Sequence, residues 1–291
     1  MTQPVLRFAP SPNGRLHLGH VFSACENARL AARLRGRLLL RIEDIDTTRC
    51  REDLVASMLD DLAWLGLPFA PDPMRQSTRF PVYQAAAAGL RARGLAYPCA
   101  CSRKEIAAAV AAREAEAGAP GPRDPDGAPL YPGTCRGRDP AAVLAQGRDV
   151  AWRLDMARAL AVAPGPHGYA RLADDGGATA PVPADPARWG DAVIVRKETP
   201  TSYHLSVVVD DAAQGITHVV RGRDLEAATD LHVLLQRLLG LPTPLYRHHA
   251  LVRDAAGEKL AKSLGAPPLA RLRDAGWTPE AVRAAVTPRA P

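Results

Sequence analysis

The sequence predicts an α/β fold with a Rossmann-like parallel sheet, and two observations support this fold class. Short apolar runs alternate with amphipathic segments through the first third of the chain, which is typical of parallel βαβ units. The chain has 291 residues, 47% of them apolar, so it can bury a substantial core in one large domain or in one domain with insertions.

The spacing of apolar residues predicts the elements of the N-terminal part. VLRFAP predicts a short buried strand that ends at Pro10, and RLLLRIED, residues 37–44, predicts a second strand. The other elements here are helices, predicted over 16–34, 47–65 and 83–94. Cys25 and Cys50 fall within these helical segments and are expected in the core.

The pattern changes in the middle of the chain. Residues 99–135 contain an alanine-rich helix followed by a loop rich in Pro, Gly and Asp. Within residues 150–220, the residue pattern predicts strands in AWRLDM, DAVIVRK and SYHLSVVVDD. Loops are predicted at 163–168 and 174–190. A helix returns over 224–239, and the last forty or so residues are predicted to be loops with one short helix.

Composition limits the class of protein. The net charge of +6 and the pI of about 9.3 are compatible with a polyanionic partner, although charge alone is weak evidence for one. No apolar run approaches the roughly 18 residues that a membrane span needs, and the N-terminus does not have the pattern of a secretory signal. The odd number of cysteines, five, indicates reduced thiols, and we expect a cytoplasmic protein.

The stretch PSPNGRLHLGH places a stiff turn directly before a predicted helix. Its prolines and Gly14 fix the turn, and His17 and His20 are spaced i and i+3, so they face one side of the first helical turn. A helix start binds phosphate well, and Gly19 leaves room for a planar ligand. The two imidazoles could stabilise charge that develops on a phosphoryl group. Taken alone, an HxxH pattern is more often a pair of ordinary histidines.

A second motif, GEKLAKSLG, stands near the C-terminus. Lys259, Lys262 and Ser263 lie there in a glycine-bounded loop that could bind a triphosphate. One KxxKS pattern by itself is more often a solvated charged loop. The occurrence of both motifs, in this order, is much harder to attribute to chance.

Together these motifs resemble the two ATP-binding motifs of class I aminoacyl-tRNA synthetases. RFAPSPNG and LLLRIEDIDTTR narrow the resemblance to the glutamyl and glutaminyl branch, and the similarity runs from Arg7 to about Gly265. The resemblance implies ATP with Mg²⁺ as a substrate. It also implies these catalytic and ATP-binding residues: His17, Gly19, His20, Lys259, Lys262 and Ser263.

The resemblance also assigns a glutamate site. Its residues would be Arg7, Ala9, Ser11, Glu43, Tyr203 and Arg221. Glu43 would hold the α-amino group, and Arg221 would pair with the side-chain carboxylate, which suits glutamate because glutamine could not use the charge. Without the family, Arg7 would more often be an ordinary strand-end charge. For Tyr203 and Arg221, a packing tyrosine and a surface ion pair would be as good an interpretation as contact with a substrate. Asp44 and Asp46 are expected in a solvated turn rather than a metal site.

Cysteines stand at both ends of the segment 99–135. Cys99 and Cys101 lie at its start and Cys135 at its end, so three thiolates could bind a tetrahedral Zn²⁺. Cysteines are also often simply buried. By resemblance alone, Tyr131 would be the fourth ligand, and the zinc would be structural.

The resemblance divides the chain into four regions. These are the N-terminal half of the nucleotide-binding domain (1–98), a zinc-binding insertion (99–150), the second half of the catalytic domain (151–240), and the KLAKS loop with a tail (241–291). Longer members of the branch continue into a helical domain that reads the anticodon, and we expect no anticodon-binding domain here.

A compact type of synthetase in this branch fits that outline. It activates glutamate with ATP and transfers it to queuosine in the anticodon loop of tRNA(Asp), and we expect this activity, from a monomer. The alternatives are a glutamyl-tRNA synthetase fragment that charges the 3′ end of tRNA(Glu), a small-molecule nucleotidyltransferase, and a non-catalytic zinc module that binds RNA.

Overall fold

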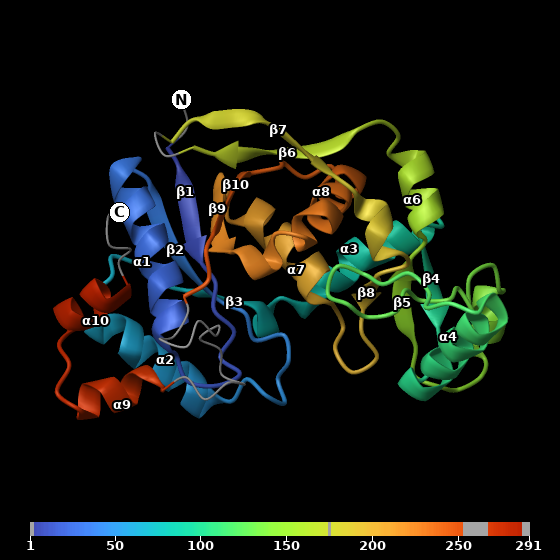
Figure 1. Cartoon of the computed structure of the whole chain (residues 1–291), viewed down its shortest axis with the longest axis horizontal. Coiled ribbons are helices and arrows are strands. Elements are labelled where there is room, and N and C mark those ends of the chain that lie inside the picture. Colours follow the sequence, from blue (N-terminus) through green and yellow to red (C-terminus); the bar gives the residue numbers. More distant parts are fainter. Residues whose placement is uncertain (1–2, 174–175, 253–266, 287–291) are drawn as a thin grey trace.

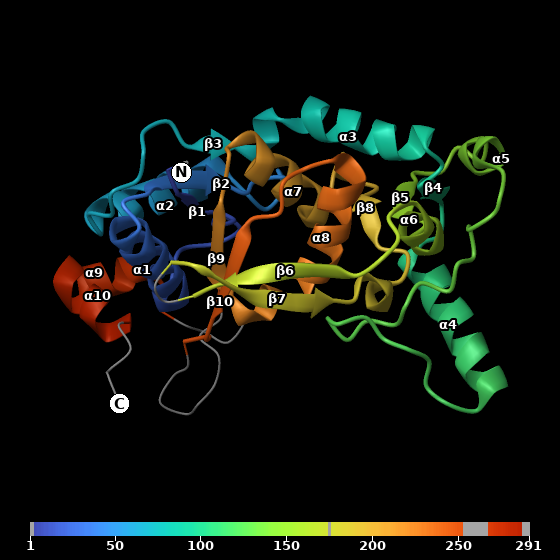
Figure 2. The same cartoon turned by 90° about the horizontal axis from the view of Figure 1, so that it is seen from above.

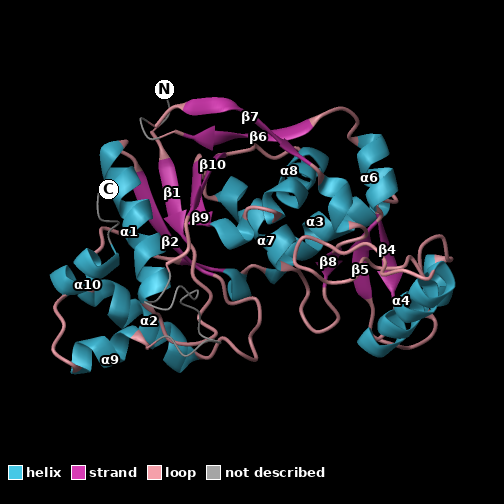
Figure 3. Ribbon diagram, in the orientation of Figure 1, coloured by secondary structure: helices cyan, strands magenta, loops and turns pink. Residues whose placement is uncertain are grey.

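A seven-stranded sheet organises the fold (Figures 1 and 3). The computed structural model describes residues 3–173, 176–252 and 267–286. In spatial order the strands are β3 (Met74–Arg75), β2 (Arg37–Ile42), β1 (Val5–Phe8), β9 (His218–Gly222), β10 (Leu245–His249), β6 (His167–Leu172) and β7 (Ala178–Ala184). Every neighbouring pair is parallel except β6 and β7, so the predicted α/β class with a mostly parallel sheet is confirmed.

Most helices fall into two groups, each of which packs around its own apolar cluster (Figures 1 and 2). One group is α1 (Leu18–Arg33), α2 (Glu52–Trp64), α9 (Leu269–Asp274) and α10 (Pro279–Val286). The other is α3 (Phe80–Ala92), α6 (Met156–Val162), α7 (Tyr203–Ala213) and α8 (Ala228–Leu239). None of the helices in the described part combines the length and the apolar character that crossing a bilayer requires.

Alternation along β1 separates an apolar face of the sheet from a charged one. Leu6 and Phe8 pack in apolar clusters with α1, whereas Arg7 between them bonds to Asp211 on α7. Arg41 on β2 makes the same contact. Successive strand residues point to opposite faces, so α1 and α7 cover opposite faces of the sheet.

A separate three-stranded sheet lies at the other end of the long axis from α1 and α2 (Figure 1). Its strands, all antiparallel, are β4 (Ala96–Cys99), β5 (Ala151–Leu154) and β8 (Val193–Val195). The connection from β4 to β5 contains α4 (Arg103–Ala117), which has no buried residue, and α5 (Pro140–Leu144). Three short 3₁₀ helices complete the described elements: η1 (Gln76–Thr78), η2 (Pro186–Trp189) and η3 (Arg223–Leu225).

The segment SYHLSVVVDD is the helix α7, and the expectation of a strand there was wrong. Ser202 begins the helix by accepting a hydrogen bond from the Leu205 N–H. Six of its residues are buried, Asp210 and Asp211 among them, because α3 and α8 also pack against it. A helix buried on several sides carries an almost continuous apolar run, and periodicity does not distinguish such a run from a buried strand.

Two further expectations need correction. The predicted loop over 174–190 contains β7, whose Pro181 and Pro183 are tolerated because β7 is an edge strand with one side unpaired. The predicted loop over 163–168 overlaps the start of β6, at His167. Towards the C-terminus the structure has two helices, α9 and α10, where one was expected.

Candidate active site

A cavity of about 660 Å³ opens at the carboxyl ends of β1, β2, β9 and β10. In the sheet, β1 lies between β2 on one side and β9 on the other, so the strand order reverses at β1. Ligands bind at such switch points in parallel sheets. The predicted residues that line the cavity are Arg7, Ala9, Ser11, His17, Gly19, His20, Glu43, Tyr203 and Arg221. Lys259, Lys262 and Ser263 lie outside the described residues.

The two motif histidines form a reciprocal cap at the start of α1. The Gly19 N–H donates to His17 Nδ1 at 3.1 Å, and the His17 N–H donates to His20 Nδ1 at 3.1 Å. The ring centroids are 3.9 Å apart. Because each Nδ1 accepts a hydrogen bond, each neutral imidazole carries its proton on Nε2 and can donate there. The cap also occupies the Gly19 N–H, which donates to His17 and not to a ligand.

A buried chain of charges joins β1, β2 and α7. Asp211 Oδ1 accepts from Arg7 Nε at 2.9 Å and from Arg41 Nη1 at 2.7 Å. Arg41 is fully buried and also donates to Glu43 Oε1 at 3.1 Å. Burial raises the pKa of Glu43 above its ordinary value, although Arg41 and Arg7 act in the other direction. Arg41 therefore holds Glu43 at the cavity edge, and the charges of the two arginines do not fully offset the desolvation of Glu43.

Arg221, at the end of β9, has a different environment from Arg7 and Arg41. It donates from Nη1 to the Tyr203 hydroxyl at 3.2 Å and from Nη2 to Thr229 Oγ1 at 2.8 Å. It also contacts His232 Nδ1 at 3.2 Å. Its Nε is buried without a hydrogen-bond partner, and no carboxylate in the described chain forms a salt bridge with it. A buried guanidinium with only neutral partners favours an anionic ligand in the cavity.

The histidines around Arg221 are uncharged. Burial, with the Arg221 charge, lowers the pKa of His204 to about 4 and that of His232 well below 6.5. The same causes, burial first, lower the pKa of His248 to about 3. Near neutral pH these rings therefore add no positive charge beside Arg221.

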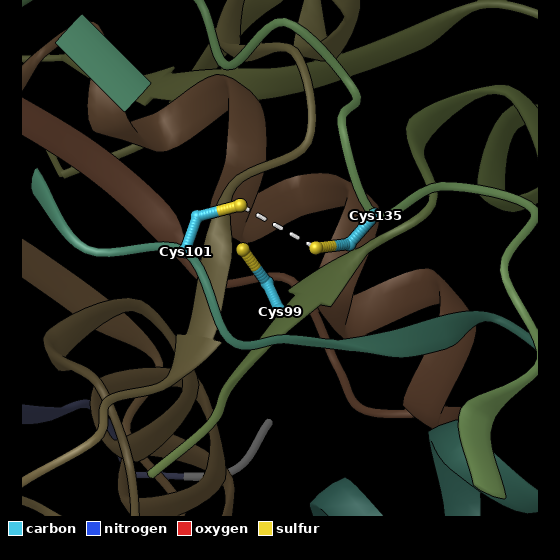
Figure 4. Close-up of side chains that lie close together, drawn as sticks. All are labelled: Cys99, Cys101 and Cys135. Carbon is cyan, nitrogen blue, oxygen red and sulfur yellow. Dashed lines mark hydrogen bonds between the residues drawn. The ribbon is translucent and has the colours of Figure 1, made fainter. Parts of the chain in front are cut away.

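The three predicted cysteine ligands lie together at the end of β4 and in the loop before α5 (Figure 4). The sulfurs of Cys99, Cys101 and Cys135 are all within 4.8 Å of one another, and those of Cys101 and Cys135 are 3.5 Å apart. The Tyr131 hydroxyl lies 3.3 Å from the Cys99 sulfur and 3.7 Å from that of Cys101. Burial raises the pKa of the Cys101 thiol to about 11, so a bound metal would have to displace its proton. Three soft donors and one oxygen can hold a metal ion.

Two residues outside the cavity differ from expectation. Asp44 is buried and accepts from Arg75 at 2.8 Å and from the Ser77 hydroxyl at 2.7 Å, so it does not lie in a solvated turn. Asp46 accepts from the Thr48 hydroxyl within its own turn. Cys50 is buried in the turn before α2 rather than on a helix, because α2 begins at Glu52.

Sequence reasoning did not single out four residues that contact the predicted site residues: Arg41, Asp211, Thr229 and His232. A signal was present for Arg41, since a charge within the apolar run RLLLRI indicates a buried ion pair. Thr229 and His232 give no such signal, because their contacts depend on how α8 packs beside β9.

Comparison with known proteins identifies relatives along most of the chain. The family model for "tRNA synthetases class I (E and Q), catalytic domain" matches residues 4–128 and 178–289. Glutamyl-Q tRNA(Asp) synthetase of Rhodobacter capsulatus is 45% identical over 96% of this chain and 98% of its own length. Glutamyl-Q tRNA(Asp) synthetase of Thiobacillus denitrificans is 42% identical over 92% of this chain and 81% of its own length.

Longer proteins also match. Glutamate–tRNA ligase 2 of Nitrosococcus oceani is 39% identical over 95% of this chain, but only 57% of that protein is covered. The crystal structure of a glutamate tRNA ligase from Elizabethkingia meningosepticum, in complex with its amino acid, superposes with a TM-score of 0.70 at 26% identity. That match covers 92% of this chain and 54% of the solved one.

Proposed function

The chain belongs to the glutamyl and glutaminyl family of class I tRNA synthetases, and from this premise we propose that it activates glutamate with ATP and transfers it to queuosine in the anticodon loop of tRNA(Asp). The observation that carries the glutamate assignment is the buried Arg221 guanidinium at the cavity wall, whose hydrogen-bond partners among the described residues are all uncharged. A side-chain carboxylate offsets that charge, and a side-chain amide does not.

The rest of the cavity complements an α-amino acid. Glu43 lies across the sheet end from Arg221 and would pair with the substrate ammonium group. Arg7, with Tyr203 and the turn residues Ala9 and Ser11, would complete the wall around the bound glutamate.

The activation step joins glutamate to the nucleotide. A glutamate α-carboxylate oxygen attacks the α-phosphorus of ATP, the bond to the bridging oxygen breaks, and pyrophosphate leaves. The Nε2–H groups of His17 and His20 would stabilise charge on the phosphoryl oxygens, and Gly19 would allow the adenosine to approach α1. Lys259, Lys262 and Ser263 would bind the phosphates, and Mg²⁺ bound with ATP would neutralise them.

In the transfer step a hydroxyl of the queuosine base attacks the activated carbonyl carbon. An ester forms, AMP leaves, and the hydroxyl proton is released. The protein forms no covalent intermediate, so positioning and charge stabilisation account for its contribution. One chain supplies each of the glutamate-binding groups named above, which supports our proposal of a monomer, and we place its activity in the cytoplasm.

Zinc is our proposal for the ion at the cysteine cluster. Thiolates of Cys99, Cys101 and Cys135 with the Tyr131 oxygen would give four ligands without an open position, which is typical of a structural site. The cluster lies at the opposite end of the long axis from α1 (Figure 1), so a role in holding the insertion fits better than a role in activation.

One experiment tests both the glutamate and the RNA assignments. We expect glutamate-dependent exchange of pyrophosphate into ATP without tRNA. We also expect labelled glutamate to be transferred only to tRNA that was isolated from cells that make queuosine. Transfer that ignores queuosine and charges the 3′ end of tRNA(Glu) would instead support a glutamyl-tRNA synthetase activity. Absence of glutamate-dependent exchange would favour a different nucleotidyltransferase.

A further inference from the structure

We propose that Thr229 and His232, two residues on one face of α8, are positioning residues that set the preference for glutamate over glutamine by holding Arg221 with uncharged partners. The inference rests on the proposed function, because it concerns the same glutamate site. It adds two residues that do not line the cavity themselves.

The geometry ties α8 to the end of β9. Thr229 and His232 are three residues apart, so both project from one side of the helix. Both are essentially fully buried. Thr229 Oγ1 accepts from Arg221 Nη2 at 2.8 Å, and His232 Nδ1 lies 3.2 Å from Arg221 Nη1. Two contacts of this kind fix the plane of a guanidinium.

The direction of each hydrogen bond follows from the chemistry of arginine. A guanidinium can only donate, so His232 accepts at Nδ1 and carries its proton on Nε2. The His232 Nε2–H then donates a hydrogen bond to His204 Nδ1, 3.2 Å away. By the same argument, the Thr229 hydroxyl accepts from Arg221, and it is also hydrogen-bonded to His248 Nε2 at 3.0 Å. Each chain of hydrogen bonds begins at Arg221 and ends on a neutral imidazole.

The arrangement differs from the one around the neighbouring buried arginines. Arg7 and Arg41 share the Asp211 carboxylate, so their charge is largely matched within the protein. Arg221 is held as firmly, but its partners are hydroxyls and an imidazole. The Arg221 charge is therefore not balanced by these partners and is available to pair with a ligand carboxylate. An acidic residue at position 232 would supply that carboxylate internally and weaken the preference for glutamate.

The experiment compares His232→Asp with His232→Asn. Both variants can place an oxygen where Nδ1 stands and both lose the contact with His204, so charge is the main difference between them. In ATP–pyrophosphate exchange we expect the KM for glutamate to be about 30-fold higher in H232D than in H232N, while the KM for ATP agrees within about twofold. Inhibition by glutamine should become stronger relative to glutamate binding in H232D. Thr229→Val, which keeps the shape and removes the acceptor, should raise the KM for glutamate about fivefold, the effect of one lost hydrogen bond.

The outcomes separate the inference from the proposed function. If the wild-type chain lacks glutamate-dependent exchange, the proposed function itself is wrong. If wild type is active and H232D matches H232N, the charge argument is overturned while the function stands. If either variant fails to give a wild-type circular dichroism spectrum, T229V decides, and an unchanged KM for glutamate in that variant overturns the positioning role.

Discussion

The Asp211 carboxylate on α7 lies 2.7 Å from the Arg41 guanidinium on β2, and both side chains are almost completely buried. The contact joins residues that are 170 positions apart in the chain. Arg41 also contacts Glu43, and Asp211 also contacts Arg7, so this one pair fixes two predicted glutamate-binding groups. Stability and substrate binding are therefore coupled at this point.

Replacing Asp211 with Asn is expected to destabilise the protein strongly. The substitution leaves two buried guanidiniums without their shared carboxylate, and removing one partner of a buried pair costs about 3–5 kcal/mol. The free energy of unfolding from urea titration measures the effect. Asp53→Asn is the matched control, because the Arg51–Asp53 pair is exposed to solvent and is expected to contribute little to stability. Equal stabilities of the two variants would contradict the role given to Asp211.

The raised pKa of Glu43 predicts a pH dependence of glutamate binding. Burial shifts this pKa above 4.5, so the carboxyl becomes neutral at a higher pH than an exposed glutamate does. A neutral carboxyl cannot pair with the substrate ammonium group. We therefore expect kcat/KM for glutamate to fall as the pH is lowered through the Glu43 pKa and to level off above it.

Glu43→Gln is the test of that assignment. The variant should have a low kcat/KM for glutamate at every pH, because the amide carries no charge, and its acid limb should disappear. Titration of glutamate-dependent exchange between about pH 5 and pH 8 measures both profiles. A wild-type acid limb that persists unchanged in the variant would assign the dependence to another group.

His17 combines a structural and a chemical role, and His17→Asn separates them. Asparagine is a good N-cap residue, and its side-chain oxygen can accept the Gly19 N–H that His17 Nδ1 accepts now. The variant should therefore keep its melting temperature within a few degrees. It lacks the Nε2–H donor, so we expect kcat for ATP–pyrophosphate exchange to fall about 10²-fold or more.

A histidine outside the cavity supplies the control for that comparison. His167→Asn, at the start of β6, changes the same residue type away from the cavity and should leave kcat near the wild-type value. An H17N variant with full activity would show that the imidazole serves only as a cap.

The family resemblance indicated the residues of this cavity, and the structure brings them together because the cavity wall is built from short segments at strand ends. Arg7, Glu43 and Arg221 each stand at or just after a strand, and parallel strands bring their carboxyl ends to one edge. The topology then places segments 36 and 178 residues apart in the chain, from Arg7 to Glu43 and from Glu43 to Arg221, around one space.

The layer behind the cavity could not be predicted in this way. The apolar run of α7 has no clear helical period, so Asp211 was predicted to lie on a strand. Its contacts with Arg7 and Arg41 could not be predicted from that position. His232 looks like one more residue on an amphipathic helix until α8 is packed beside Arg221. Contacts of this kind depend on tertiary packing, which local pattern does not contain.

The cysteine cluster leads to a prediction about metal content. Cys101→Ser removes one of the three clustered thiols, and a serine hydroxyl is a poor zinc ligand, so bound zinc should fall from about one equivalent to well below half. Cys25→Ser is the control, because Cys25 lies on α1 away from the cluster and should leave the zinc content unchanged. Atomic absorption of the purified, dialysed proteins measures both.

The same variant distinguishes a structural metal from a catalytic one. The ligands connect the end of β4 with the loop before α5, and loss of the ion should loosen that connection and lower the melting temperature. None of the cluster residues lines the cavity at the ends of β1, β2, β9 and β10, so the kcat of glutamate-dependent exchange should change by less than about threefold in C101S where the protein is folded. Loss of exchange with an unchanged melting temperature would instead make the ion part of the activation chemistry. Zinc retained at one equivalent in C101S would show that the cluster is not where the metal binds.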